Sequence, residues 1–428
     1  MLNRETINAM LKQMEEEGVE TVRLQFTDIT GTLKSIAVTP AKFAMLKEEP
    51  FFVDGTFLAG RDGEDGVELM LKPDPSTFSI LPWKSQPGNV ARLLCSLCKE
   101  DGTPFEEDSR EVLKQAERRA AALGFELSVR PECEFFLFHS DDDGCPTVVT
   151  HERAGYLDAH PVDLGENARR EMVRTLEEMG VEVEASRHEI SPGQHGIDLK
   201  RMGLMEAADG IVTFRSTVRS VAKRHGLHAT FMPKPLGDAE GSGVHLHFTL
   251  CRDGKNVFAG EEKGGFSREA VWFVSGLLEH MKAMTAVSNP LVNSYKRLVS
   301  GTKAPTELYW SSRRENCLLR IPPVRGTRTR VEFRGADGSA NPYLLLALCL
   351  EAGLDGIARK LEIPEGESLG RLPENLGTAI SCFREDEFVK KTLGEPLCRR
   401  YAACRQEEWM DYERQVTSWE LREYLYRY

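Results

Sequence analysis

Hydrophobic and polar residues alternate with two different periods along the chain, and the change of period predicts where strands and helices lie. A polar helix pattern at 4–17 comes first, and a series of short period-two runs typical of strands follows. These runs occupy 21–29, 34–40, 67–73, 77–81 and 89–97. The first hundred residues therefore predict a small, mostly β unit, which ends at the turn Asp101-Gly102-Thr103-Pro104.

Beyond residue 104, strand and helix patterns alternate over a much longer region. Strands are predicted at 127–138, 181–190, 227–235, 243–250 and 329–335. Helices are predicted at 109–123, 163–179, 205–225, 267–288, 341–361 and from about 386 onward. Together these patterns predict an α+β chain, with a small β-rich domain at 1–103 and a large domain at 104–428.

Charge and hydropathy argue against two classes of protein. The chain has 55 Lys and Arg against 67 Asp and Glu, a formal net charge of −12, whereas a nucleic-acid binder needs a basic face. The most apolar run, 343–350, is far shorter than the ~20 residues that span a bilayer, and the first residues lack the apolar stretch of a signal peptide. We therefore expect a cytoplasmic protein that binds neither nucleic acid nor membrane.

Four of the predicted strands carry polar or ionisable side chains at every second position, which places those side chains on one face of each strand. The sets are Glu132 with Glu134, Glu184 with Ser186 and His188, His245 with His247, and Arg330 with Glu332 and Arg334. A single set is typical of a solvated strand face or a surface ion-pair ladder. Four sets in one domain, rich in carboxylates with one or two histidines, favour a site for Mg²⁺ or Mn²⁺. Because arginines accompany the carboxylates, the pattern indicates phosphoryl transfer.

A glycine-rich segment precedes the histidine-bearing strand. Glu240-Gly241-Ser242-Gly243 lets the backbone approach a ligand closely just before His245. The segment matches neither the P-loop nor the dinucleotide-binding fingerprint. The residues alone therefore predict a metal-dependent enzyme that acts on a nucleotide or a phosphate, and they do not name its substrate.

Long runs of the chain resemble type I glutamine synthetase, the shorter bacterial and archaeal form, over essentially the whole length. The resemblance is carried in order by VRLQFTDITGTLKSIAV, PECEFFLF, LEEMGVEVEASRHEISPGQH, GSGVHLH, NPLVNSYKRLV and RGTRTRVEFR. It implies the glutamine synthetase fold, with an N-terminal β-grasp domain beside a large catalytic α/β domain. It also implies a homo-dodecamer of two stacked hexameric rings, with active sites between neighbouring subunits.

The resemblance further implies a ligase reaction in nitrogen metabolism. ATP and glutamate form γ-glutamyl phosphate, and ammonia then displaces the phosphate, with Mg²⁺ or Mn²⁺ bound. By resemblance, Glu134 and Glu189 hold the metal beside glutamate, whereas Glu132, His245 and Glu332 hold the metal on the ATP phosphates. Positions matched to the nucleotide are Glu184, His247, Thr249 and Arg320, and positions matched to glutamate are Gly241, Arg297 and Arg334. The matched catalytic residues are Arg320, Arg334 and Asp54, the last acting in a neighbouring subunit to help deprotonate ammonium.

Several departures from the family's pattern fall within the site itself. Gly196 stands where the family has a glutamate that ligates the metal beside the glutamate substrate. Lys303 stands where the family has a flap glutamate that accepts the ammonium proton. Glu315 occupies the position of a catalytic arginine, with Arg314 adjacent, and Glu240 replaces an asparagine. We therefore expect glutamine formation from ammonia to be very weak or absent.

Two functions remain open at this point. The first is a γ-glutamyl ligase that joins glutamate or a related acid to ammonia or another amine. The second is a catalytically impaired homologue with a regulatory or nucleotide-binding role. A metal-dependent guanidino-type kinase has no support in the sequence.

Overall fold

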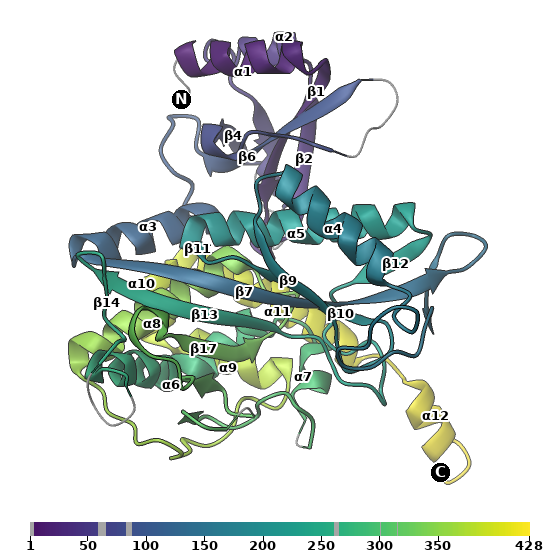
Figure 1. The fold of residues 1–428 in the computed structure, drawn as a ribbon, viewed down its shortest axis with the longest axis vertical. Helices are drawn as coiled ribbons and strands as arrows, with labels where there is room; N and C mark the ends of the chain where they lie inside the picture. Colours follow the sequence, from purple (N-terminus) through teal and green to yellow (C-terminus); the bar gives the residue numbers. More distant parts are fainter. Residues whose placement is uncertain (1–3, 59–65, 83–87, 261–264, 300, 315) are drawn as a thin grey trace.

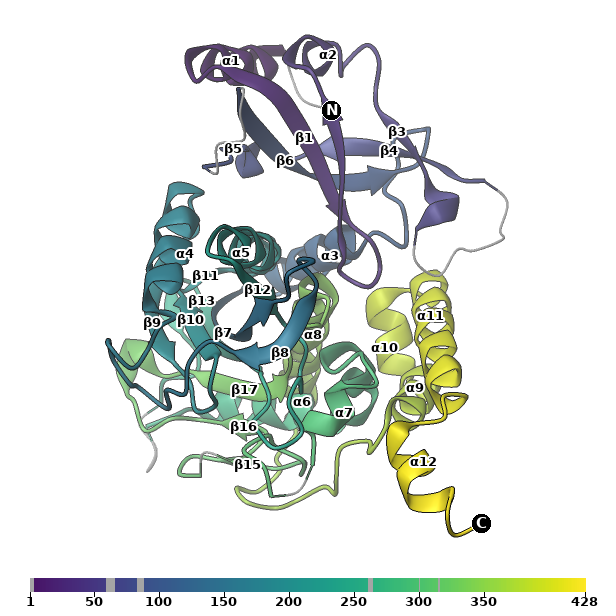
Figure 2. The ribbon, with the colours of Figure 1, turned by 90° about the vertical axis from the view of Figure 1, so that its right-hand side faces the viewer.

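Two β-sheets organise the molecule, a small one near the N-terminus and a large one that carries the rest of the chain. The computed structural model describes residues 4–58, 66–82, 88–260, 265–299, 301–314 and 316–428. In both views the small sheet lies apart from the large one, with a layer of helices between them (Figures 1 and 2). The yellow C-terminal end of the chain projects away from the body of the large part.

The N-terminal part is a sheet packed by two helices. Its elements are α1 (Arg4–Glu16), β1 (Val19–Thr27), β2 (Leu33–Val38), α2 (Pro40–Ala44), β3 (Phe52–Asp54), η1 (Gly55–Phe57), β4 (Glu68–Pro73), η2 (Pro75–Thr77), β5 (Ser79–Ile80) and β6 (Asn89–Cys98). The strand order is β2-β1-β6-β4-β3, with β5 beside β6 and the central pair β1 and β6 parallel. Helix α1 buries Ile7, Met10 and Met14, which lie on one face at helical spacing. The apolar positions of the period-two strands thus meet one helical stripe in a small core.

The large sheet is centred on β7, a strand of 16 residues. The strands are β7 (Phe125–Ser140), β8 (Pro146–Thr150), β9 (Val183–His188), β10 (Gln194–Leu199), β11 (Met202–Gly203), β12 (Leu227–Thr230), β13 (Val244–Arg252), β14 (Lys255–Asn256), β15 (Trp310–Ser311), β16 (Leu319–Arg320) and β17 (Val331–Ala336). The main path runs β15-β16-β17-β13-β7-β10-β9. Along β7, Cys133 and Phe135 are buried in the core while Glu132 and Glu134 point to the other face.

Helices cover the apolar face of this sheet and complete the C-terminal region. They are α3 (Ser109–Ala122), α4 (Glu166–Glu178), α5 (Leu204–Arg224), α6 (Arg268–Ser288), α7 (Ser294–Arg297), η3 (Gly326–Arg328), α8 (Pro342–Arg359), α9 (Leu376–Glu385), α10 (Glu387–Leu393), α11 (Glu395–Glu413) and α12 (Ser418–Tyr424). Helices α3, α4 and α5 form the layer between the two sheets (Figure 2). One continuous core joins α3, α5, α6 and α8 to β7 and β13. No described helix has both the length and the apolar character needed to cross a membrane.

The predicted fold class is confirmed, and the differences concern the ends of elements and several mostly short elements that were not predicted, among them α2, β3, β8, α7 and α9. Helix α4 begins at Glu166 instead of 163, and β12 ends at Thr230 instead of 235. Strand β10 (Gln194–Leu199) was also not predicted, because only Ile197 and Leu199 of its six residues are apolar, although all six are buried. This strand matters for function, since it inserts between β7 and β9 and carries Gly196.

Candidate active site

A cavity of about 630 Å³ lies on the polar face of the large sheet. Its strand-borne lining consists of Glu132 and Glu134 from β7, His245 and His247 from β13, and Glu332 and Arg334 from β17. The prediction that each of these pairs shares one strand face is confirmed, because both members of each pair line the same cavity. Alternation in three neighbouring strands therefore concentrates ionisable side chains at one place.

Strand pairing brings two histidines to one carboxylate. His245 lies opposite Glu132 in the register of β13 and β7, with its Nδ1 3.5 Å from Glu132 Oε2. His247 Nε2 lies 2.7 Å from Glu132 Oε1. Burial raises the pKa of Glu132, but the two imidazoles outweigh burial and hold that pKa well below its usual range. Glu132 is therefore ionised at neutral pH.

Glu332, at the same end of the cavity, is also kept ionised. Burial raises its pKa, but the charges of His247, Arg334 and His245 lower it below the ordinary value. Two ionised carboxylates and an imidazole, Glu132, Glu332 and His245, form a donor set that suits a hard divalent cation such as Mg²⁺ or Mn²⁺. The residues matched to the phosphate-side metal therefore fit such a group.

Guanidinium groups surround this donor set. Arg334 Nη1 pairs with Glu332 Oε1, and Arg320 Nη1 lies 3.6 Å from Glu332 Oε2. Arg330 Nε donates a hydrogen bond of 3.1 Å to His247 Nδ1, which leaves the His247 proton on the nitrogen facing Glu132. Seven cationic side chains line the cavity against five carboxylates, an excess that favours an anionic ligand such as a phosphate.

Arg297 defines a second anion-binding position in the cavity. Its side chain is buried, with 4% exposed, and it packs against Gly241 and Gly243. Its Nη1 has no hydrogen-bond partner among the residues that the structure describes. A buried guanidinium with an open N–H suits the carboxylate of a substrate. This placement agrees with the glutamate-binding role that the resemblance implies for Gly241 and Arg297.

The other half of the cavity contains a second group of carboxylates around Glu134 and Glu189. Glu134 Oε2 accepts hydrogen bonds from the Gly243 N–H at 2.8 Å and from Gln194 Nε2 at 3.2 Å. Burial and the negative charge of Glu134 raise the pKa of Glu189 to about 7, although Arg187 lowers it. Arg187 Nε lies 2.7 Å from Glu189 Oε1. A guanidinium thus already pairs with Glu189, one of the two carboxylates matched to the metal beside glutamate. The third carboxylate of the family's pattern is replaced by Gly196. This half therefore does not fit the metal site that the family's pattern describes, which has three glutamate carboxylates.

Two of the sequence departures meet at the rim of the cavity. The Lys303 backbone N–H donates a hydrogen bond of 3.3 Å to Glu240 Oε2, and both residues line the cavity. The Glu240 backbone N–H donates to Ser191 Oγ at 2.9 Å, which ties the glycine-rich segment to the segment after β9. A basic side chain therefore stands at the wall where the resemblance would place a proton-accepting glutamate.

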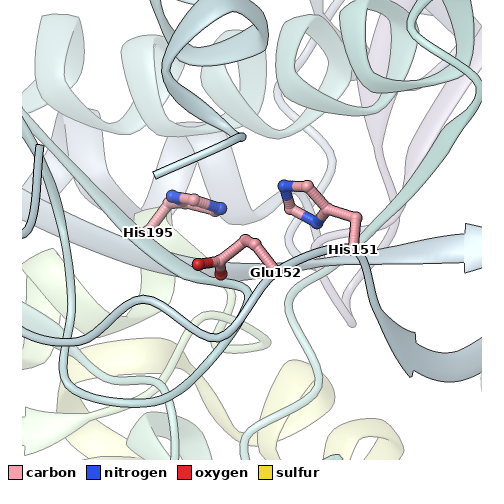
Figure 3. A group of neighbouring side chains, drawn as sticks. All are labelled: His151, Glu152 and His195. Carbon is pink, nitrogen blue, oxygen red and sulfur yellow. The ribbon is translucent and has the colours of Figure 1, made fainter. Parts of the chain in front are cut away.

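Two histidines and a carboxylate lie behind the Glu189 half, where His151 and Glu152, adjacent in the chain, approach His195 of β10 (Figure 3). Arg169 Nη1 donates to His195 Nδ1 at 2.9 Å, so the His195 proton resides on Nε2 and neither nitrogen has a free lone pair for a metal. His188 bridges the Glu152 carboxylate, at 2.9 Å, and the Glu189 carbonyl, at 2.7 Å. His188 therefore links Glu152 of this cluster to the Glu189 backbone and helps to position it.

Not every predicted site residue reaches the cavity. Glu184 is exposed on β9, and Thr249 is buried on β13; neither lines the cavity. Asp54 lies on β3 in the N-terminal part and caps η1 by accepting from the Thr56 N–H at 2.9 Å. A role for Asp54 in a neighbouring subunit stays a prediction, and Glu315 lies outside the described residues.

Several lining residues were missed from the sequence, among them Arg130, Arg187 and Gln194. Arg130 pairs with Glu132, two positions along the same strand. Its position in the period-two pattern of β7 could have indicated it, because 130, 132 and 134 share one face. Gln194 begins the unpredicted strand β10, so no pattern in the sequence pointed to it.

Comparison with known families places both parts of the chain in one family. The glutamine synthetase beta-Grasp domain matches residues 18–100, and the glutamine synthetase catalytic domain matches residues 106–424. The chain is 46% identical over 435 aligned residues to a glutamine synthetase of Clostridium saccharobutylicum, covering 98% of each protein. It is 43% identical to a glutamine synthetase of Staphylococcus aureus (strain MW2), covering 97% of each.

Solved structures with the same fold are also similar in sequence. A GmaS/ADP complex superposes with a TM-score of 0.88 at 32% identity, covering 97% of this chain and 99% of that one. GmaS without ligand superposes with a TM-score of 0.87 at the same identity. The fold and site define an ATP-dependent carbon–nitrogen ligase of the kind that works with divalent metal. The chain belongs to the glutamine synthetase family.

Proposed function

We propose that the protein forms γ-glutamyl phosphate from glutamate and ATP and transfers the γ-glutamyl group to an amine, with ammonia as a poor acceptor. The proposal rests on one observation: the phosphate-facing end of the cavity keeps the side chains of the family's pattern, whereas the opposite wall does not. The kept groups are Glu132, His245, Glu332, Arg297, Arg320 and Arg334. The changed wall contains Lys303 and the Arg187–Glu189 ion pair.

In the first step, a carboxylate oxygen of glutamate bonds to the γ-phosphorus, the β–γ bridging bond breaks, and ADP leaves. Arg297 binds the substrate carboxylate, and Arg320 and Arg334 neutralise charge on the transferring phosphoryl group. A divalent cation held by Glu132, His245 and Glu332 would supply further charge neutralisation at the phosphates.

In the second step, the amine nitrogen bonds to the acyl carbon and inorganic phosphate leaves. The nitrogen must lose a proton, and the resemblance assigns that task to a flap glutamate and to Asp54 of a neighbouring subunit. Here the flap position is Lys303, whose positive charge repels ammonium. Primary amines are also cationic at neutral pH, but their carbon groups can bind the cavity and offset this repulsion. Ammonium has no such group, so the loss bears most heavily on ammonia.

The test is phosphate release from ATP with Mg²⁺ or Mn²⁺, screened over glutamate and related acids and over ammonia and primary amines, with products identified by mass spectrometry. We expect a γ-glutamyl amide to form at least tenfold faster with an organic amine than with ammonia. The Arg297→Gln variant should lose turnover, whereas the exposed Arg174→Gln variant should keep it. Preferred formation of glutamine from ammonia would overturn the proposed acceptor.

A second function is a catalytically impaired homologue that binds nucleotide and acts in regulation. It is favoured by the same changed wall, Gly196 and Lys303, together with the sequence change at Glu315. Nucleotide-induced stabilisation without phosphate release from any acid and amine pair would establish this function instead.

A further inference from the structure

The register of three neighbouring strands puts an arginine beside the glycine that replaces a metal ligand. In the pairing of β9 with β10, Arg187 lies opposite Gly196, and in the pairing of β10 with β7, Gly196 lies opposite Glu134. Residues opposite one another in antiparallel strands project from the same face. Arg187, Gly196 and Glu134 therefore form one row across the cavity face, with the Cα of Gly196 between the two ionisable side chains.

The Arg187 guanidinium crosses the space above Gly196 and joins two carboxylates. Its Nε lies 2.7 Å from Glu189 Oε1, and its Nη1 lies 2.6 Å from Asp198 Oδ2. Asp198 is two residues beyond Gly196 on β10, which is the diagonal neighbour of Arg187 across the strand pair. The Arg187 side chain is 22% exposed, and the Glu189 and Asp198 side chains are each 7% exposed. A partly buried cation thus holds two nearly buried anions.

Glycine at 196 leaves room for this arrangement. A Cβ added at Gly196 would overlap Glu189 Oε1, the same oxygen that pairs with Arg187 Nε. The overlapping atom is the end of the Glu189 side chain, so a larger residue at 196 would require Glu189 to move away from its contact with Arg187. The change to glycine and the placement of Arg187 are therefore parts of a single rearrangement.

We propose that the Arg187 guanidinium is the resident cation of this half of the cavity, so that the protein binds one divalent cation, at Glu132, His245 and Glu332, where the family's pattern describes two. The guanidinium is always protonated, and its positive charge offsets carboxylates that a metal ion would otherwise bind. Unlike a metal ion, it accepts no electron pair from a substrate oxygen. It therefore neutralises Glu189 and Asp198 without polarising the substrate. The proposal does not rest on the proposed ligase activity.

The test is the number of Mn²⁺ ions bound per subunit by the full-length protein without substrates, measured by calorimetry and by the electron paramagnetic resonance signal of free Mn²⁺. We expect one ion for the wild type. The Glu332→Gln variant should lose that ion, and the Glu189→Gln variant should keep it, because Glu189 is engaged with Arg187. These measurements detect metal binding whether or not the protein is catalytically active.

Two further variants test the replacement directly. Gly196→Glu alone should leave the count at one, because the Arg187 guanidinium still occupies the cation position beside Asp198. Arg187→Ala combined with Gly196→Glu should raise the count to two, since it vacates the cation position and adds a third carboxylate. Arg174→Ala is the matched control: this arginine is on the surface of α4 and pairs with Glu178 at 3.4 Å, and its loss should leave the count unchanged.

The possible outcomes separate clearly. Two ions in the wild type, with Glu189→Gln reducing the count to one, would overturn the proposal, and so would no bound ion. One ion that survives Glu332→Gln but not Glu189→Gln would place the metal in the wrong half and would also overturn it. If the double variant does not fold, the wild-type, Glu332→Gln and Glu189→Gln counts still decide.

Discussion

The carboxylates of the cavity depend on their immediate neighbours for both charge and position. Glu132 is flanked by two imidazoles and by Arg130, and Glu332 is flanked by Arg334 and Arg320. A buried carboxylate left without such partners would take up a proton and lose its affinity for cations. The phosphate-facing end is therefore a set of mutually dependent residues, in which one change affects several contacts.

The first prediction follows from this dependence. ATP with Mg²⁺ should raise the melting temperature of the wild type, because a ligand at about 100 times its dissociation constant stabilises the native state by about 2.7 kcal/mol. Glu332→Gln should lose most of the rise, since it removes one metal-binding charge and the partner of Arg334. Differential scanning fluorimetry measures both, with the exposed Glu178→Gln as control. No shift at millimolar nucleotide would contradict a retained ATP site.

The second prediction concerns the glycine next to Arg297. A Cβ added at Gly243 would lie 2.5 Å from Arg297 Nη2, so Gly243→Ala should push the guanidinium out of position. Overpacking of this kind typically costs about 1–3 kcal/mol, which corresponds to roughly tenfold or more in binding. We expect KM for glutamate to rise by that factor while KM for ATP changes little.

A glycine in the same loop provides the control. Gly237 has no atom within 4 Å of an added Cβ, so Gly237→Ala should leave both KM values unchanged. Equal effects of the two substitutions would show that the loop, and not Arg297, is disturbed.

At the level of strands and helices, the sequence was informative wherever one face of an element is buried and the other is not. The period-two runs of β7, β13 and β17 predicted both the strands and the faces that line the cavity. Strand β10 is buried on both faces and begins after Pro192 and Gly193, so its residues resemble a loop. The relation between Arg187 and Gly196 depends on that strand and could not be seen before the register was known.

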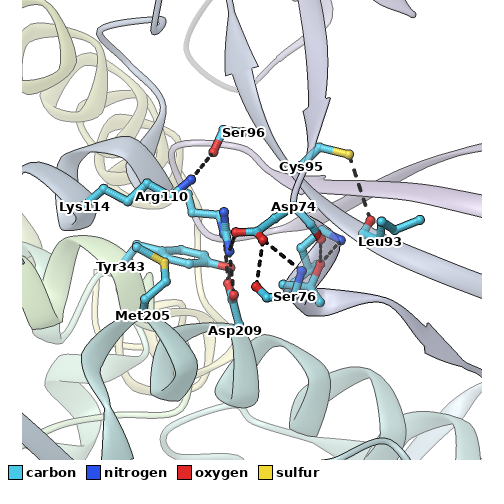
Figure 4. Close-up of polar contacts among 12 residues, drawn as sticks. Asp74, Ser76, Leu93, Cys95, Ser96, Arg110, Lys114, Met205, Asp209 and Tyr343 are labelled. Carbon is cyan, nitrogen blue, oxygen red and sulfur yellow. Dashed lines mark hydrogen bonds and ion pairs between the residues drawn. The ribbon is translucent and has the colours of Figure 1, made fainter. Parts of the chain in front are cut away.

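Contacts between elements distant in sequence could not be predicted from the sequence either. Arg110, near the start of α3, links the N-terminal part to α5 (Figure 4). Its Nη2 lies 2.9 Å from Asp74 Oδ2 and 2.7 Å from Asp209 Oδ2, and Tyr343 Oη donates to Asp209 Oδ1 at 2.7 Å. The Arg110 side chain is 3% exposed, so this ion pair is largely removed from solvent.

The third prediction is that Arg110→Met lowers the apparent melting temperature markedly. Removing one member of a buried ion pair costs about 3–5 kcal/mol, because it leaves an uncompensated buried charge, here that of Asp209. Arg118→Met on the same helix is the matched control. Its side chain is 71% exposed and pairs with Glu111 at 3.3 Å, a contact worth about 1 kcal/mol or less. Similar losses in both variants would contradict a special role for the Arg110 junction.

At the scale of the whole molecule, the C-terminal helix α12 lacks a partner within the described part of the chain that would cover its apolar side chains. It projects from the body (Figure 1), and Trp419, Leu421 and Leu425 are 51%, 49% and 72% exposed. Clustered apolar exposure of this kind marks interaction surfaces. Asp54 also lies outside the cavity of its own chain. Both observations support the predicted ring-shaped homo-oligomer.

The fourth prediction is therefore that the protein assembles into a large homo-oligomer, expected as two hexameric rings, and that removing 418–428 reduces the assembly. Loss of the apolar α12 contacts should weaken association between copies without unfolding them, because none of the α12 residues is buried in its own chain. Light scattering coupled to size exclusion measures the mass of both forms. A stable wild-type monomer at micromolar concentration would contradict the prediction.

The last prediction concerns how well the whole protein uses ammonia as the acceptor, given the residue changes in its site. By the resemblance, Gly196 stands at the position of a metal ligand, and Glu315 stands at that of a catalytic arginine. An arginine at a transferring phosphoryl group can be worth about 10³–10⁵ in rate. The charge of Lys303 would in addition repel ammonium. Glutamine formation from ammonia should therefore fall far below the ~10 s⁻¹ typical of enzymes. Restoring the pattern needs four substitutions rather than three, because after Gly196→Glu alone the Arg187 guanidinium would still occupy the position proposed for a cation. Arg187→Ala, Gly196→Glu, Lys303→Glu and Glu315→Arg together should raise glutamine formation, measured by coupled ADP release and by mass spectrometry of the product. The variant that keeps Arg187 should gain less, and wild-type turnover already near 10 s⁻¹ with ammonia would refute the argument.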